Sequence, residues 1–334
     1  MTRRARLTIA AAFAIVAAIG AFAGWRVSLA RSASSLPAVL TPEAVMPSPL
    51  QPARVEPPSQ AAPAARPTVE APIQAPLADA PRPPTPAERE PAPRALPFEV
   101  GEELRYQVLW SGGGGVSLPA GDAVFRVETR AVRPGAARPG YRFELTITTA
   151  SWVSAFFEAR DRFWSLTGPD LEPMTHVQEL NEGRRHATRT MTFDAPRGRV
   201  LVASGAPESA STAAEFPWVA GVRDPLGAFY EARLIGVTPA SRLSLPVNNV
   251  GHALTLLLGG VELTSVAAEG RAQQALLLDA RIDEAGSQEP NPSARVWFST
   301  DARRIPLAID VSGAFGTLRV ELTSYRRGAP SPGA

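Results

Sequence analysis

Apolar and polar residues alternate with a period of two along most of the chain after residue 97. In Glu103–Trp110 (ELRYQVLW), every second position from the first leucine onward is apolar, and arginine and glutamine stand among the residues between. Such alternation is typical of a strand with one buried face. Ser111 and four glycines follow, and the alternation returns at Asp122–Thr129. The sequence therefore predicts a β-hairpin with a long loop.

The alternating pattern recurs through the rest of the chain, with short turn-like connections between the runs. We therefore expect a mainly β domain in which about a dozen strands form an antiparallel meander. This meander would form a partly open barrel or a strongly curved sheet that packs on one short helix. The expected strands are Glu103–Trp110, Asp122–Thr129, Tyr141–Thr149, Glu158–Leu166, Pro173–Leu180, Arg184–Asp194, Arg199–Ala203, Arg242–Val247, Ala253–Val266, Gln274–Asp283, Arg295–Ser299, Pro306–Ser312 and Thr317–Tyr325.

Two of these runs carry more specific information. Asn181–Gly183 lies between two alternating runs and predicts a hairpin, in which Glu179 would face Arg185 or His186. Leu254–Leu258 has leucines on both faces of the expected strand, so that strand is expected to be covered on both sides.

One stretch, residues 224–234 (DPLGAFYEARL), has the spacing of a helix instead. Aspartate is a favourable N-cap and proline suits the first helical turn. Four apolar residues fall on one face of that helix: Leu226, Phe229, Tyr230 and Leu234. We expect this amphipathic helix to bury that face against the sheet and to plug the open barrel. A shorter helical turn is expected at Ser151–Phe157.

The N-terminal 31 residues predict export. Arginines in Met1–Arg6 precede 19 uncharged residues, Leu7–Trp25, and a helix of that length spans roughly 28 Å, close to a bilayer core. An uncleaved inner-membrane anchor fits this length, whereas Ala21–Ala23 would suit cleavage of a signal peptide. In both cases the positive end stays in the cytoplasm and the rest faces the periplasm.

Ser32–Pro97 is expected to be a disordered linker, because it holds 18 of the 34 prolines and little core-forming material. Extended as polyproline II at about 3.1 Å per residue, it would reach about 200 Å. The β-rich periplasmic domain would then occupy residues 98–328, followed by a flexible tail at 329–334.

Charge argues against a nucleic-acid partner. The whole chain carries a formal charge of +2, but the segment 1–31 alone holds five arginines and no acid. Residues 95–334 have a net charge of −2, from 24 arginines against 26 acids. A domain without a basic stripe is not suited to phosphate backbones.

The residue types that are missing exclude several chemistries. The sequence has no cysteine and no lysine, which removes thiol nucleophiles, disulfides, Schiff-base lysines and the phosphate-loop lysine. His176, His186 and His252 are too scattered for a metal site, and no Gly-x-Ser-x-Gly elbow occurs. We expect no catalytic residue, no metal and no cofactor. Asp161, which lies between two arginines, is expected to be a salt-bridged strand residue.

Aromatic residues suggest a ligand site. Five gather within the segment 152–164, and others could join them in an apolar cavity inside the barrel, although plain core packing would also explain them. The candidate ligand-binding residues are Trp110, Trp152, Phe156, Phe157, Trp164, Phe229, Tyr230 and Arg233. Arg233 would contact an anion or, as we favour, form an ion pair with a strand carboxylate.

In combination, several motifs resemble the bacterial exported family known as domain of unknown function 3108 (DUF3108). They are F-x-x-G-E-x-L-x-Y-x-V-x-W from Phe98 to Trp110, the Arg162–Thr192 block with Glu182-Gly183 at its turn, the pair Phe193-Asp194, and Asp224-Pro225-Leu226 followed by Tyr230-x-x-Arg233. The resemblance covers about residues 98–327 and implies an envelope protein with no assigned activity. Gly227 departs from the serine that the family often has.

A second, shorter resemblance concerns Val296–Phe298, Asp301 and Pro306-Leu307. These residues are similar to a hairpin of periplasmic lipoprotein carriers, whose incomplete antiparallel barrel wraps helices and holds acyl chains. The resemblance implies an open-barrel architecture.

Three functions therefore remain open. The domain could bind an apolar or amphipathic envelope molecule, such as a lipid or a lipidated partner, which the aromatic residues favour. It could instead be a structural or protein-interaction module of the envelope. An enzyme, such as a hydrolase, has the least support, and a deep cleft that gathers two carboxylates or a His–carboxylate pair would favour it.

Overall fold

The computed structural model describes residues 96–112, 116–129, 140–155, 157–205, 212–284, 293–313 and 316–328. The expected anchor, nearly all of the expected linker and the tail lie outside the described residues and stay predictions. Within the described ranges, no helix is both long and apolar enough to cross a membrane.

The described residues form 14 strands and few helical segments. The strands are β1 (Glu103–Ser111), β2 (Ser117–Thr129), β3 (Tyr141–Thr149), β4 (Arg160–Thr167), β5 (Pro173–Glu182), β6 (Arg185–Asp194), β7 (Arg199–Gly205), β8 (Thr212–Pro217), β9 (Arg242–Asn249), β10 (His252–Ala268), β11 (Arg271–Glu284), β12 (Ser293–Ser299), β13 (Pro306–Gly313) and β14 (Gly316–Arg326). The helical segments are α3 (Ser151–Ser154), the 3-10 turn η2 (Ala195–Arg197) and α4 (Pro225–Ile235).

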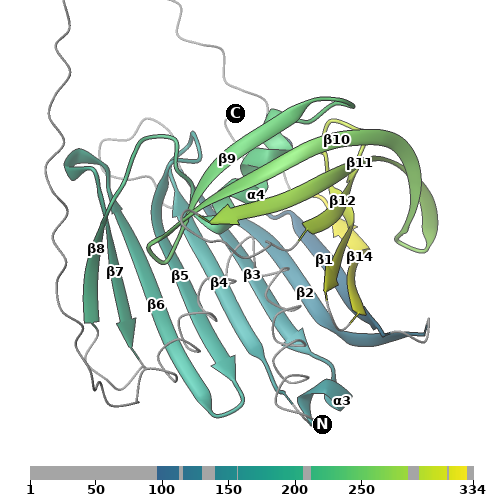
Figure 1. The fold of residues 1–334 in the computed structure, drawn as a ribbon, viewed down its shortest axis with the longest axis horizontal. Coiled ribbons are helices and arrows are strands. Elements are labelled where there is room, and N and C mark those ends of the chain that lie inside the picture. The colour runs from purple at the N-terminus through teal and green to yellow at the C-terminus, as the bar shows by residue number, and fades with distance from the viewer. Residues whose placement is uncertain are drawn as a thin grey trace, which may run out of the picture. The chain divides into compact units, whose positions relative to one another are not determined.

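All 14 strands belong to one antiparallel sheet, as the alternation predicts (Figure 1). β1–β8 form one meander and β9–β14 form another, and the pairing of β1 with β14 joins them. β8 and β9 are the two edges of the sheet, and among the described strands no backbone ladder closes it. Helix α4 connects these two edge strands along the chain.

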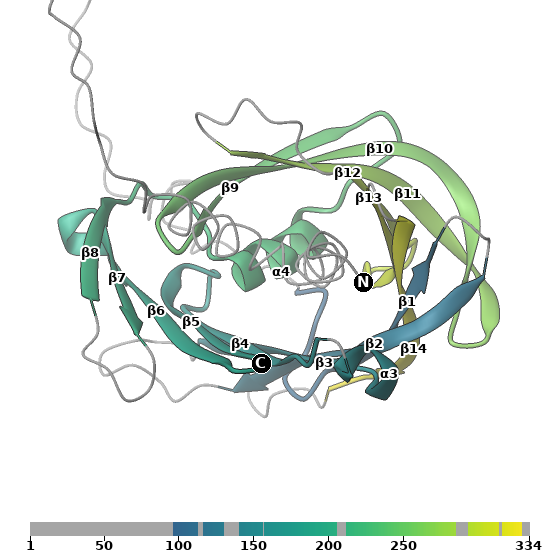
Figure 2. The same ribbon diagram turned by 60° about the horizontal axis from the view of Figure 1, so that its bottom comes forward.

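The sheet curves until its two halves face each other, and α4 lies in the space between them (Figure 2). The helix contacts β9 on one side and β3 and β4 on the other. Most of its residues are buried, so the single apolar face expected from the sequence is too narrow a description. A helix that is covered on most sides is a core element.

The ends of α4 follow from its sequence. The Asp224 side chain accepts hydrogen bonds from the backbone N–H groups of Leu226 and Gly227, both at 3.0 Å. Pro225 occupies the first helical position, where no N–H is needed. Gly236 ends the helix with φ of +71°, which favours glycine.

Several details of the predicted strands are wrong. Strand β8 was not expected, because Thr-Ala-Ala-Glu carries little alternation, and β2 begins at Ser117 although a proline and a glycine interrupt its pattern. The predicted hairpin between β5 and β6 is confirmed, but in its ladder Glu179 lies opposite Thr188 and not opposite Arg185 or His186. The basic residue opposite Glu179 is Arg162, on the other neighbouring strand, β4. The ladder ends at the pair Glu182 and Arg185, which leaves a two-residue turn.

The strand with two covered faces is β11 and not β10. Residues 275–278 of β11 are buried at four consecutive positions, whereas Leu257 of β10 is half-buried on the outer face. On the outer face, Leu277 pairs with Trp297, and the guanidinium groups of Arg295 and Arg319 lie over the indole ring. These arginines supply the cover that a second layer would otherwise give.

The sheet has one large hydrophobic core around α4 and a smaller one under its edge. The smaller cluster comprises Met191, Phe193, Val200 and Val202, with Phe216, Trp218 and Val250 packed against it. Val250 belongs to the β9–β10 turn, so side chains connect the two ends of the sheet. Arg223, which follows β8, adds two backbone hydrogen bonds to β9. Every strand pairing and both clusters lie within residues 96–328, so a chain that begins at residue 32 retains all the described contacts.

Candidate functional site

A buried polar network surrounds the N-terminus of α4. The Oγ of Ser165 donates a short hydrogen bond to Oδ1 of Asp224 (2.5 Å) and lies 2.9 Å from Nδ1 of His176. Gln178 donates to Oδ1 of Asn249 at 2.8 Å and lies 3.4 Å from Nε2 of His176. These side chains join β4, β5 and the end of β9 to the helix cap.

This network holds the three residue types of a hydrolase triad, but not the triad arrangement. Ser165 and Asp224 both approach Nδ1 of His176, whereas a triad places the serine and the carboxylate on opposite ring nitrogens. All three residues are completely buried. Burial raises the pKa of Asp224. The opposing effects are larger: His176 lowers this pKa through its hydrogen bond and its charge, and the hydrogen bonds from Ser165 and the Gly227 N–H lower it as well. The net pKa of Asp224 is therefore below its ordinary value. The arrangement therefore serves to fix the cap of α4.

A second buried cluster holds the C-terminal half of α4. Arg233 donates to both carboxylate oxygens of Glu102, at 2.6 and 3.0 Å, and also to the backbone carbonyls of Pro97 and Arg303. Both side chains of this ion pair are buried. The expected pairing of Arg233 with a carboxylate is thus confirmed, although Glu102 immediately precedes β1 and is not a strand residue. The helix is tied to the start of β1 and to the β12–β13 turn.

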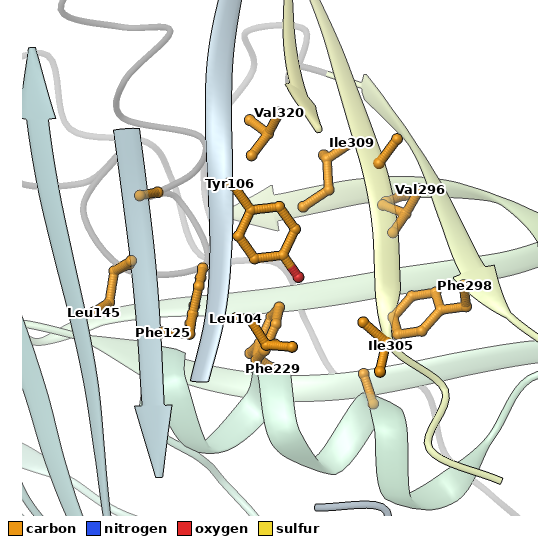
Figure 3. Packing of buried hydrophobic residues seen from close by; sticks show 14 of the residues in the cluster. Leu104, Tyr106, Phe125, Leu145, Phe229, Val296, Phe298, Ile305, Ile309 and Val320 are labelled. Carbon is orange, nitrogen blue, oxygen red and sulfur yellow. The ribbon is translucent and has the colours of Figure 1, made fainter. Parts of the chain in front are cut away.

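The aromatic residues of α4 pack into the core. The Phe229 ring stacks on Phe125 with centroids 4.5 Å apart, and Tyr230 stacks on Phe143 at 3.9 Å. Figure 3 shows Phe229 beside Phe125, on which it stacks, with Phe298 on the β12 side. These rings fill space on the β1–β4 side of the helix.

Free space does remain between α4 and strands β10–β13. An apolar cavity of about 50 Å³, which we call the inner chamber, lies against one side of the helix. Its walls are aliphatic and aromatic apart from one charged residue, Arg281. The lining residues that matter below are Phe229, Ala232, Leu256, Ala294, Val296 and Phe298.

A second cavity of about 160 Å³, the outer chamber, lies under the loop that follows α4. Ala232 and Phe298 line both chambers, so these two side chains form the wall between them. The outer chamber has leucines from β10 and β11 on one side. Its other side is polar, with Thr238, Ser299 and Arg304.

The structure does not gather the expected ligand residues around one cavity. Of the seven that it describes, Phe229 alone lines either chamber. Trp164 lies half-buried on the outer face, with the Arg142 guanidinium 4.9 Å from its ring centroid. Trp152 is exposed and donates to the carbonyl of Pro119. Phe156 lies outside the described residues.

The other expected residues contribute to packing. Trp110 is half-buried and packs against the main core, and Phe157 is half-buried after α3. Tyr230 and Arg233 are buried as described above. Sequence reasoning missed the chamber walls formed by β10–β13, because ordinary strand leucines give no sign of which side of a helix stays unfilled. The available sequence signal was the alternation of Val296 and Phe298, which places both side chains on the same face of the strand.

The expectation for Asp161 is wrong. The side chain is buried and accepts a hydrogen bond from the backbone N–H of Asn181 at 2.8 Å, instead of pairing with the flanking arginines. Alternation along β4 directs those arginines to the opposite face. Burial raises the pKa of Asp161 to about 7, and this increase exceeds the lowering effects of the Asn181 N–H and Arg185.

In the described part of the chain, no group of three His, Asp or Glu side chains is placed to hold a metal ion. The two apolar-walled chambers beside α4 are the candidate functional site.

Comparison with known proteins places the chain in a sequence family. A family model with the description "Protein of unknown function (DUF3108)" matches residues 105–323. No curated protein matches the sequence.

Three solved structures resemble the chain at low identity. A β-barrel-like protein of domain of unknown function DUF1849 from Brucella abortus is 10% identical, with a TM-score of 0.49, over 70% of this chain and 100% of that chain. A candidate exported protein with a YmcC-like fold from Bacteroides fragilis is 10% identical, with a TM-score of 0.29, over 70% and 98%. A candidate lipoprotein from Parabacteroides distasonis is 8% identical, with a TM-score of 0.28, over 69% and 98%. At these values the similarities carry no functional information.

Proposed function

The chain belongs to the DUF3108 family, a family of unknown function, and from this premise we propose that its β domain binds an apolar or amphipathic molecule beside helix α4. The observation that supports this proposal is the inner chamber, an unfilled apolar space beside the hydrophobic core. Unfilled apolar volume destabilises a core, at roughly 24 cal/mol per Å³. An apolar ligand would recover part of that loss.

The composition of the walls sets the chemistry of the ligand. Leu256, Val296 and Phe298 offer no hydrogen bonds from their side chains, so a polar ligand would lose its hydration without compensation. A hydrocarbon chain has no such penalty. We propose an envelope molecule with at least one alkyl or acyl chain as the ligand class.

We also propose that the domain works in the periplasm, attached to the inner membrane through the N-terminal segment. The support is the sequence alone: the arginines before Leu7–Trp25 and the proline-rich stretch after it. A tether of that kind would let the domain meet lipids or lipidated proteins of the envelope at a distance from the membrane.

A protein-interaction module is the second candidate. Val116, Leu118 and Trp152 are exposed apolar side chains near the β1–β2 connection and α3. Leu118→Asp should then abolish crosslinking to an envelope protein while leaving ligand binding unchanged. If the crosslinks persist in this variant, this surface is not the docking site.

The binding proposal can be tested with the protein that starts at residue 32, using the apolar fluorophore 1-N-phenylnaphthylamine. We expect saturable fluorescence enhancement, which Ala294→Phe abolishes because the added ring fills the inner chamber. Ala187→Phe is the matched control, since Ala187 is also a half-buried strand alanine but lies on β6, away from the chamber. Equal fluorophore binding by both variants would contradict the proposal.

A further inference from the structure

The outer chamber has one charged side chain among its lining residues, Arg304. Its other polar residues are the neutral Thr238, Ser299 and Thr300, and the remainder are apolar. A lone cation beside apolar walls is suited to a ligand that carries a negative charge on a hydrocarbon chain.

The Arg304 guanidinium is held by the end of α4 and has no carboxylate partner among the described residues. Its Nη1 group donates to the backbone carbonyls of Arg233 and Leu234, at 3.0 and 3.3 Å, and so caps the C-terminus of α4. Among the described residues, no carboxylate lies within ion-pair distance of it. The nearby Asp301 is engaged by Arg303 and by Ser299. Because its position is set by the helix end, Arg304 is preorganised for an anion.

The neighbouring arginines show why this one is different. Arg233 is saturated by both oxygens of Glu102 and by two carbonyl groups. Arg303 pairs with Asp301 and lies over the Tyr325 ring. Of these three arginines, only Arg304 both lines a chamber and has no carboxylate partner among the described residues.

The volumes and positions of the two chambers indicate where the alkyl chain of such a ligand would lie. The outer chamber, at about 160 Å³, is comparable to an engineered cavity of roughly 150 Å³ that holds benzene. The smaller inner chamber lies directly behind the wall made by Ala232 and Phe298. These volumes suit a single alkyl chain and are too small for the two acyl chains of a diacyl lipid.

We infer that Arg304 binds the carboxylate or phosphate head of a single-chain amphiphile in the outer chamber, with the alkyl chain directed past Phe298 into the inner chamber. This inference rests on the proposed binding function and deepens it. The head group forms charge-assisted hydrogen bonds with the guanidinium, and the chain contacts Leu263, Leu276 and Leu278.

The experiment measures displacement of 1-N-phenylnaphthylamine from the polypeptide that starts at residue 32, by four ligands that each have one ten-carbon chain. They are decanoate, decyl phosphate, decanol and decyltrimethylammonium. We expect the two anions to compete at concentrations about tenfold lower than decanol, and the cation to be the weakest competitor. Decanoate as the best competitor would indicate a free fatty acid, and decyl phosphate a lysophospholipid-type head.

Arg304→Gln should remove the preference for anions, so that the affinity for decanoate falls about tenfold more than the affinity for decanol, whereas Arg304→Lys should keep a preference. Thermal unfolding of each variant checks that the cap of α4 is intact. If the fluorophore binds but decanoate and decanol compete equally in the unchanged protein, the head-group inference fails and the proposed function stands. If the fluorophore does not bind, the proposed function fails. If Arg304→Gln lowers the affinities for decanoate and decanol equally, the assignment of Arg304 to the head group is also overturned.

Discussion

At the scale of single residues, the buried polar groups of this protein are the least visible in its sequence. Glu102 and Arg233 are separated by 131 positions, and no local pattern indicates that they form a bidentate pair. The same holds for Ser165, His176 and Asp224, which meet only because the sheet brings β4 and β5 to the helix cap. Periodicity predicts which face a residue occupies, but not its partner across the core.

The two buried tyrosines give a matched test of hydrogen bonding. Within the described residues, the Tyr230 hydroxyl has no hydrogen-bond partner, whereas the Tyr106 hydroxyl donates to the carbonyl of Pro306 at 2.8 Å. Tyr230→Phe should therefore leave the free energy of unfolding unchanged or raise it by about 1 kcal/mol. Tyr106→Phe should lower it by about 1 kcal/mol. Urea unfolding measures both, and a larger loss for Tyr230→Phe would contradict the described environment.

Asp161 should make stability depend on pH. Its pKa is raised from 3.8 to about 7 by burial, against the lowering effects of the Asn181 N–H and Arg185 and with a further raising effect from Glu182. The folded state therefore holds the proton more tightly than the unfolded chain, so the contribution of this group is greatest at low pH and is lost as the pH rises through about 7.

Asp161→Asn removes that dependence while keeping an acceptor for the Asn181 N–H. We expect the variant and the unchanged protein to be equally stable near pH 4 and the variant to be more stable near pH 8, by up to about 4 kcal/mol. Urea unfolding across this pH range measures the difference. A difference that does not change with pH would show that Asp161 titrates normally.

At the scale of elements, local patterns predicted the strands and the position of α4 well. The alternation in β1 and the Asp-Pro start of α4 are properties of a few neighbouring residues. The burial of α4 on most sides is not, because it depends on how far the sheet curves around it. For the same reason the sequence could not show that β11, and not β10, is covered on both faces.

The ion pair at the C-terminal half of α4 should behave as a buried pair. Arg233→Met leaves the Glu102 carboxylate buried without a cation, so we expect the free energy of unfolding to fall by about 3–5 kcal/mol. Adding Glu102→Gln should recover part of this loss, since the uncompensated charge is then absent. Arg185→Met is the control, because Arg185 pairs with Glu182 at the surface. This variant should lower the free energy of unfolding by less than about 1 kcal/mol.

At the scale of the whole domain, the unclosed sheet is the feature that leaves room for a site. The sequence predicted an open or curved sheet and an apolar interior, and the structure shows that α4 fills one side of that interior and leaves chambers on the other. The aromatic residues that the sequence emphasised mostly pack or face outward. The walls of the inner chamber are mostly common aliphatic residues, whose role is decided only by the position of the helix.

The contact between the two sheet edges can be tested through glycine. Gly251 in the β9–β10 turn has φ of +87°, and a side-chain carbon there would lie 2.5 Å from the Phe216 ring. Gly270 has φ of +71° with nothing within 4 Å. In both alanine variants, backbone strain should lower the free energy of unfolding by about 1–2 kcal/mol. Gly251→Ala should lose more, and equal losses in thermal or urea unfolding would show that the edges do not touch.

The most direct test of the binding site is a crystal structure of the chain from residue 32 grown with decanoate. We predict electron density for one ligand, with its carboxylate at Arg304 and its chain beside Phe298 and Ala232. Empty chambers with decanoate bound elsewhere, for example on the exposed side chains of Leu118 and Trp152, would contradict the account.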